Sequence, residues 1–164
     1  MKKLLVFLLS FFALFTITYT NSTVVHASKI KTEKGVNKKI AKDLKMAHGW
    51  ADGSLDEDGN PTDNGTPDEE YAWSALVYKI KYYDDGDYLG DLRIYVRHEF
   101  LSLSKKERNA VIRTAMRYSY GAINDYYKMS YDDIKEGPIT DIYVSQTPIG
   151  ISKLSNHYKF KWYE

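Results

Sequence analysis

The chain has 164 residues, of which 43% are hydrophobic, 15% aromatic and 27% charged. This composition is typical of a globular protein and argues against an intrinsically disordered one. The 23 basic and 22 acidic residues give a net charge of +1, which argues against a nucleic-acid partner because phosphate binding usually needs a strong basic excess. No cysteine is present, so disulfides, thiolate metal sites and cysteine nucleophiles are excluded.

The N-terminus has the three-part pattern of a secretory signal peptide. Lys2 and Lys3 precede the apolar run Leu4–Ile17, and Val25 and Ala27 give the pattern of a cleavage site. An uncleaved membrane anchor is the alternative, but the run is short of the roughly 20 apolar residues that cross a bilayer. We therefore predict a secreted or extracytoplasmic bacterial protein, cleaved after Ala27 and without stable membrane insertion afterwards.

Residues 28–48 are rich in lysine and predict a short amphipathic helix. Val36, Ile40 and Leu44 fall on one helix face, and we expect the helix to run from Val36 to Ala47. The lysines indicate either a basic helix that docks on an anionic cell surface or a solvated face over an apolar stripe. We favour the solvated face because the stripe is thin and lacks clusters of Leu or Phe.

Residues 49–70 form an acidic segment with eight carboxylates and no basic residue, which predicts a long loop. An EF-hand beginning at Asp56 would need Gly and Glu where Pro61 and Pro67 stand, so that motif is excluded. The remaining alternatives are a solvated acidic loop and a looser calcium-binding loop. Calcium prefers several oxygen ligands. The candidate ligands are Asp56, Asp58, Asn60 and Asp63.

The segment from Glu70 to His98 predicts a β-hairpin. Period-two alternation covers Leu76–Tyr83 and Leu92–His98, and Asp84–Asp87 supplies a turn. In the first arm, Tyr78 alternates with Val77 and is expected on the inner face. Six side chains are expected on the solvent face: Lys79, Lys81, Tyr83, Arg93, Tyr95 and Arg97.

A long helix is predicted from Ser104 to Lys128. Ser104 and Glu107 form a capping box at its start, and Ser130 with Asp133 begins a further short turn that ends at Gly137. A stripe of residues at helical spacing is expected to be buried: Ile112, Ala115, Met116, Ser119, Ala122, Ile123 and Tyr126. The opposite face is expected to be exposed, including Arg113, Arg117 and Tyr120.

Strands are predicted at Ile139–Ser145 and His157–Trp162, and Ile149–Leu154 is a further candidate. Together these elements favour an α+β fold in which an antiparallel sheet of about four strands packs on one long helix. We divide the chain into the signal peptide, the lysine-rich segment, the acidic loop and an α+β domain. Their boundaries are 1–27, 28–48, 49–70 and 71–164.

Catalytic motifs are scarce in this sequence. His48, His98 and His157 are not at metal-ligand spacing, and the chain has no nucleophile elbow, phosphate loop or dinucleotide fingerprint. We therefore expect no cofactor other than the calcium of the looser loop. The function predicted is non-catalytic binding at or outside the cell envelope. The alternative is a secreted hydrolase that uses dispersed carboxylates, which leave no local motif.

Tyrosine, tryptophan and arginine side chains on the surface offer large contact area with a polar end, as binding surfaces require. The partner would be an envelope polymer or an envelope protein. We expect exposure of Trp50, Tyr120 and Tyr163 in addition to the main candidates. The candidate binding residues are Tyr83, Arg93, Tyr95, Arg97, Arg113 and Arg117.

Overall fold

A computed structural model describes residues 32–84 and 89–163. The chain divides into two units, residues 1–34 and residues 35–164, and the account below concerns the second. The predicted signal peptide and its cleavage after Ala27 lie outside the described residues. Within the described ranges, no helix has the length and apolarity that a bilayer crossing requires.

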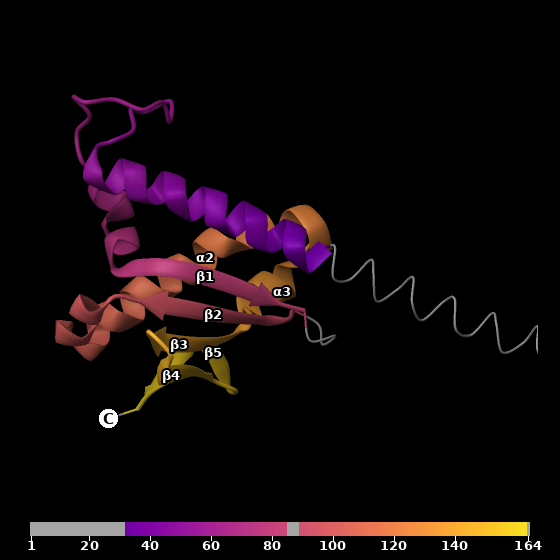
Figure 1. The fold of residues 1–164 in the computed structure, drawn as a ribbon. Coiled ribbons are helices and arrows are strands. Elements are labelled where there is room, and N and C mark those ends of the chain that lie inside the picture. The colour runs from indigo at the N-terminus through magenta and orange to yellow at the C-terminus, as the bar shows by residue number, and fades with distance from the viewer. Residues whose placement is uncertain (1–31, 85–88, 164) are drawn as a thin grey trace, which may run out of the picture. The chain divides into compact units, whose positions relative to one another are not determined.

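The sheet has five strands in the order β1-β2-β3-β4-β5 (Figure 1). The α+β class is confirmed, and the sheet differs in two details from the predicted antiparallel sheet of about four strands. The segment proposed as a further candidate is a full strand, and β2 pairs with β3 in parallel. The long helix causes the parallel pairing, because it returns the chain to the end of the sheet where β2 began. The strands are β1 (Val77–Tyr83), β2 (Asp91–Val96), β3 (Ile139–Val144), β4 (Thr147–Lys153) and β5 (Asn156–Trp162).

Helical segments connect and cover these strands. The first described helix spans residues 32–52 and is longer than predicted at both ends. The acidic segment is a loop only between this helix and the first 3-10 helix, and a second 3-10 helix replaces the expected end of the hairpin at His98. The remaining elements are η1 (Glu69–Leu76), η2 (His98–Ser102), α2 (Lys105–Tyr127) and α3 (Tyr131–Glu136).

Both predicted serine caps are confirmed. At α2, the Ser104 hydroxyl accepts from the backbone N–H of Glu107, whose carboxylate accepts from the backbone N–H of Ser104. At α3, Ser130 and Asp133 make the same reciprocal pair. Each capping box satisfies two N–H groups at the helix start that have no intrahelical partner. The caps therefore fix where these two helices begin.

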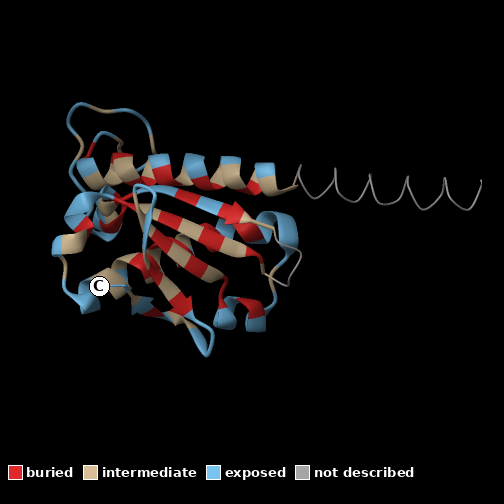
Figure 2. Cartoon of the chain, turned by 60° about the horizontal axis from the view of Figure 1, so that its bottom comes forward, coloured by how far each residue is buried: buried red, intermediate tan, exposed pale blue. Residues whose placement is uncertain are grey.

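The core lies between one face of the sheet and the helices. Helix 32–52 contributes Val36, Ile40, Leu44 and Ala47, as the apolar spacing predicts. Strands β2 and β3 contribute alternate residues, so buried bands repeat along each strand (Figure 2). The central side chains are fully buried: Leu92, Ile94, Phe100, Ile112, Met116, Ile123 and Ile142.

Three predictions of burial are wrong. Tyr120 is 8% exposed because its hydroxyl donates to the Tyr158 hydroxyl beneath α2, whereas Tyr126 near the end of the helix is 46% exposed. In β1, a register shift between Val77 and Lys79 lets Val77 turn into the core and leaves Tyr78 40% exposed. A bulge of this kind interrupts strict alternation, which is what the sequence pattern assumes.

Side chains protect both edges of the sheet. At β1, the Asn37 side chain accepts from the backbone N–H of Tyr82 at 2.8 Å and donates to the Tyr82 carbonyl at 2.7 Å. At β5, Arg113 Nε donates to the Tyr158 carbonyl at 2.8 Å. These bonds occupy strand groups that would otherwise be available for pairing with another chain. They also attach helix 32–52 to β1 and α2 to β5.

Candidate functional site

The candidate site is the sheet face that points away from the core, which we call the open face. Residues alternate between the two faces along each strand, and the helices described above pack on the core face. Along the strands, bands of intermediate and exposed residues alternate with the buried ones (Figure 2). The open face comprises Tyr78, Lys79, Lys81, Tyr83, Asp91, Arg93, Tyr95, Ile139, Asp141, Tyr143, Ile151, Lys159 and Lys161.

One line of neighbouring residues crosses all five strands of the open face. The register joins them in the order Lys81, Arg93, Asp141, Ile151 and Lys161, which we call the charged row. Strands lie about 4.8 Å apart, so the row spans roughly 19 Å. It begins with two cations directly opposite each other, an arrangement that is destabilising in an antiparallel pair. Strand pairing alone therefore does not explain this choice of residues.

Tyrosine rings form a second feature beside the charged row. The Tyr95 and Tyr143 rings are stacked, with centroids 5.3 Å apart and planes 23° apart, and the Tyr78 ring lies 6.1 Å from that of Tyr95. Cations lie over these rings: the Lys79 ammonium is 4.8 Å from the Tyr95 centroid, and the Arg93 guanidinium carbon is 4.3 Å from that of Tyr83. Such cation–π contacts hold the charged groups against the sheet.

Electrostatics at the centre of the open face favour a cationic Arg93 beside a less acidic Asp141. Burial alone would lower the pKa of the Arg93 guanidinium, but its interactions with Tyr83, Tyr143, Tyr95 and Asp141 outweigh burial and raise it. Burial raises the pKa of the Asp141 carboxyl, against the opposing effect of Arg93. Burial and then the Asp141 charge raise the pKa of Tyr143. Tyr143 therefore remains a neutral hydrogen-bonding group at neutral pH.

The structure brings together only part of the predicted binding set. Tyr83, Arg93 and Tyr95 lie on the open face. Arg97 is exposed beyond the end of β2, as the N-cap of η2. Arg113 and Arg117 lie on α2, in the layer on the other side of the sheet, and Arg113 is engaged with the β5 backbone. The four arginines therefore do not form one patch.

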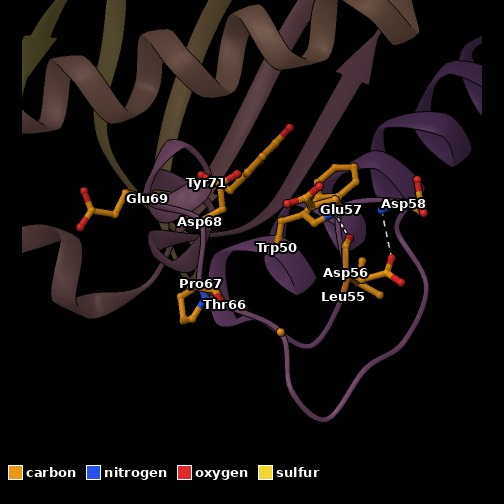
Figure 3. A pocket seen from close by; sticks show the side chains of 11 residues that line it. Trp50, Leu55, Asp56, Glu57, Asp58, Thr66, Pro67, Asp68, Glu69 and Tyr71 are labelled. Atoms are coloured by element: carbon orange, nitrogen blue, oxygen red, sulfur yellow. Dashed lines mark hydrogen bonds between the residues drawn. The ribbon is translucent and has the colours of Figure 1, made fainter.

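A hollow lies where the acidic segment folds back on helix 32–52 (Figure 3). It has a volume of about 780 Å³, and its aromatic lining consists of Trp50 and Tyr71, whose ring centroids are 4.8 Å apart. The Trp50 indole N–H donates to the Asp56 carbonyl at 3.0 Å, which fixes the ring against the loop. Carboxylates also line the hollow: Asp56, Glu57, Asp58, Asp68 and Glu69.

The calcium candidates lie in this acidic loop, and Asp56 organises it. The Asp56 carboxylate accepts from the backbone N–H groups of Asp58 and Asn60 at 3.0 and 2.8 Å, and from the Asn60 side chain at 3.3 Å. These bonds, chiefly that from the Asn60 backbone, lower the Asp56 pKa. Asp58, Asn60 and Asp63 are exposed. Within the described residues, no three His, Asp or Glu side chains are grouped as metal ligands, and calcium binding stays a sequence prediction.

Sequence reasoning missed Asp141 and Tyr143 as members of the site. Alternation with Ile142 and Val144 already placed both on one face of the predicted strand. The alternation could not predict their neighbours on the next strand. Those neighbours depend on the parallel pairing of β2 with β3, which sets Asp141 opposite Arg93 and Tyr143 opposite Tyr95. A parallel partner 48 residues away leaves no local signal in the sequence.

Comparison with known proteins adds no family to this description. No protein-family model, no curated protein and no solved structure matches the chain. Function must therefore be argued from the site itself. Chemically, the open face offers stacked rings that provide contact area and cations that attract anionic groups.

Proposed function

We propose that this chain is an exported, non-catalytic bacterial protein that binds an anionic polymer at or outside the cell envelope through the open face. Export is supported by the pattern that ends at Ala27. Binding is supported by one observation: a sheet face outside the core carries stacked tyrosines and cations held over aromatic rings. Rigid aromatic surfaces with polar ends are the groups on which binding interfaces depend most.

Charge complementarity favours an anionic partner. The open face has an excess of cations, which would attract a polyanion and increase its association rate. Aromatic rings beside them add contact area for uncharged parts of the same polymer. The cations are Lys79, Lys81, Arg93, Lys159 and Lys161, and the carboxylates are Asp91 and Asp141.

The geometry of the acidic hollow favours binding over glycoside hydrolysis. A general acid needs a carboxyl group whose pKa is raised toward the working pH. Asp56 has a lowered pKa, and its oxygens are engaged with the loop backbone. Asp68 likewise accepts from the backbone N–H of Glu70 at 2.9 Å, as the N-cap of η1. The carboxylates of Asp56 and Asp68 therefore stabilise the loop conformation.

Export is tested by the mass and N-terminal sequence of the protein recovered outside the cytoplasm of a bacterial host. We expect a product that begins at Ser28. A product that retains Lys2 and stays with the membrane fraction would refute the cleavage prediction and support an anchor.

Binding is tested by cosedimentation of the purified protein with a bacterial envelope fraction. We expect salt-sensitive retention that is lost in the double variant Lys79→Glu, Lys81→Glu. The matched control is Lys38→Glu, Lys42→Glu, which makes the same charge change on the exposed side of helix 32–52. Equal loss in both variants would indicate general charge attraction, and no loss in either would refute the proposal. Protease treatment of the envelope fraction distinguishes a polymer from an envelope protein.

A further inference from the structure

Arg93 is the residue of the open face whose polar atoms are least satisfied by the protein. Its Nε is buried and has no hydrogen-bond partner within the described part of the chain. The register places Asp141 opposite it on β3, yet among the described residues the two side chains form no ion pair. A buried guanidinium nitrogen without a partner is costly and calls for an explanation.

The residues around Arg93 hold its side chain in place but do not accept a hydrogen bond from its Nε. The Tyr83 ring lies 4.3 Å below the guanidinium carbon and supports its plane. Lys81, directly opposite on β1, adds a second positive charge, and its ammonium lies 5.9 Å from the same ring. Like charges opposite each other repel, so this arrangement is unfavourable for the free protein. An anion placed over the pair would remove the repulsion and could accept hydrogen bonds from the end of the guanidinium group.

The arrangement of hydrogen-bond donors around Arg93 favours a phosphate over a carboxylate. A carboxylate has two oxygens in one plane, and a single guanidinium fork can occupy both. The oxygens of a phosphate point in tetrahedral directions, so one group can accept from the fork of Arg93 and from a second donor at another angle. Lys81 on β1 and the tyrosine hydroxyls near Arg93 provide such donors.

We propose that Arg93 is the anchor for a phosphate group and that the anionic polymer bound by the open face is a phosphate-bearing chain. This inference rests on the proposed function, since it names the ligand class of the same surface. The polymer would cross the strands along the charged row, where Lys161 on β5 offers a further cation beyond Ile151. Asp141 lies between the cations and would reject anionic groups at that point of the row.

The test measures binding of linear polyphosphate, and of polyglutamate as a carboxylate polymer, by titration calorimetry. Arg93→Lys keeps the charge and removes the bidentate fork. We expect it to weaken polyphosphate binding by about tenfold or more, as expected for lost charged hydrogen bonds. The matched control is Arg117→Lys, the same change on the exposed side of α2, outside the open face. Equal melting temperatures would establish that each variant folds.

Three results would overturn the inference: unchanged polyphosphate affinity in Arg93→Lys, equal affinity of the protein for polyglutamate, or a dimer in sedimentation analysis that Arg93→Lys dissociates. The last would mean that a second copy covers the face. Failure of the proposed function looks different. If Lys79→Glu, Lys81→Glu still abolishes envelope retention while polyphosphate does not bind, only the phosphate assignment fails. If polyphosphate binds through Arg93 while that variant keeps envelope retention, the proposed function fails.

Discussion

The two faces of the sheet share the same strands and differ in almost every other respect. On the core face of β2, Leu92 and Ile94 are wholly buried, whereas Arg93 between them points to the open face. The core face carries apolar side chains that pack at close to crystalline density. The open face carries cations, two carboxylates and tyrosines in arrangements that strand pairing does not favour. The comparison teaches that the apolar core and the charged, aromatic face are separated here by a single step along the strand.

The largest expected effect on stability comes from comparing substitutions at two adjacent residues of β2, one on each face of the sheet. Ile94→Ala should lower the free energy of unfolding by about 2–5 kcal/mol, because it leaves a cavity in the core. Tyr95→Ala, one residue along, should cost only about 0.5–1.5 kcal/mol, the value of its aromatic pairs. Urea denaturation of both variants measures the difference. Equal losses would show that the open face is as important for folding as the core.

A smaller effect is expected where helix 32–52 attaches to the sheet. Asn37→Ala removes both hydrogen bonds to the Tyr82 backbone and should destabilise the protein by about 1–3 kcal/mol, since those groups lose their partners. Lys38→Ala, on the exposed side of the same turn, is the control and should be nearly neutral. Thermal unfolding monitored by circular dichroism distinguishes the two. If Asn37→Ala were neutral, water would be replacing the side chain at this edge.

Removing the like-charge pair of Lys81 and Arg93 should stabilise the protein, whereas the two substitutions above destabilise it. Lys81→Glu places a carboxylate opposite Arg93 and should raise the free energy of unfolding by about 0.2–1 kcal/mol. Lys79→Glu makes the same charge change opposite Tyr95 and should give no such gain. The gain should shrink in high salt, because exposed charges are screened. A destabilised Lys81→Glu protein would mean that the pair does not oppose folding.

The smallest expected effect concerns pH. Because burial raises the pKa of Asp141 in the folded state, the native protein binds more protons than the unfolded chain, and stability falls as pH rises through that raised pKa. Asp141→Asn removes this dependence and should raise the melting temperature above that pKa, with little change in acid. Melting temperatures across a pH series check the prediction. A lower melting temperature in Asp141→Asn at neutral pH would show that attraction to Arg93 dominates instead.

Local signals account for the part of the fold that could be predicted. The capping box at Ser104 and Glu107 fixed the start of α2 because both partners lie within one turn. Alternation placed Lys79, Lys81, Tyr83, Arg93 and Tyr95 on a single face. Strict alternation nevertheless failed at Tyr78, since a bulge changes the period within the strand and has no marker in these residues.

Long-range pairing accounts for most of what could not be predicted. Whether β2 pairs with β3 depends on how α2 packs over the sheet, and that decides the neighbours of Arg93. Tyr120 illustrates the same limit: its position on the helix indicated exposure, but a hydroxyl partner on β5, Tyr158, draws it inside. The candidate site was therefore predicted as a list of residues on strands and not as an arrangement.

The parallel pairing of β2 and β3 also has a kinetic consequence. The hairpin β1–β2 and the three-stranded meander β3–β4–β5 are local and can form early. Joining them closes the segment between Val96 and Ile139 at an entropic cost of about 3 kcal/mol. The centre of the sheet should then be the last part to form. Arg93 and Asp141 lie on either side of that final junction, so the charged row exists only in the completed fold. In refolding experiments, binding should therefore be recovered with the slowest phase.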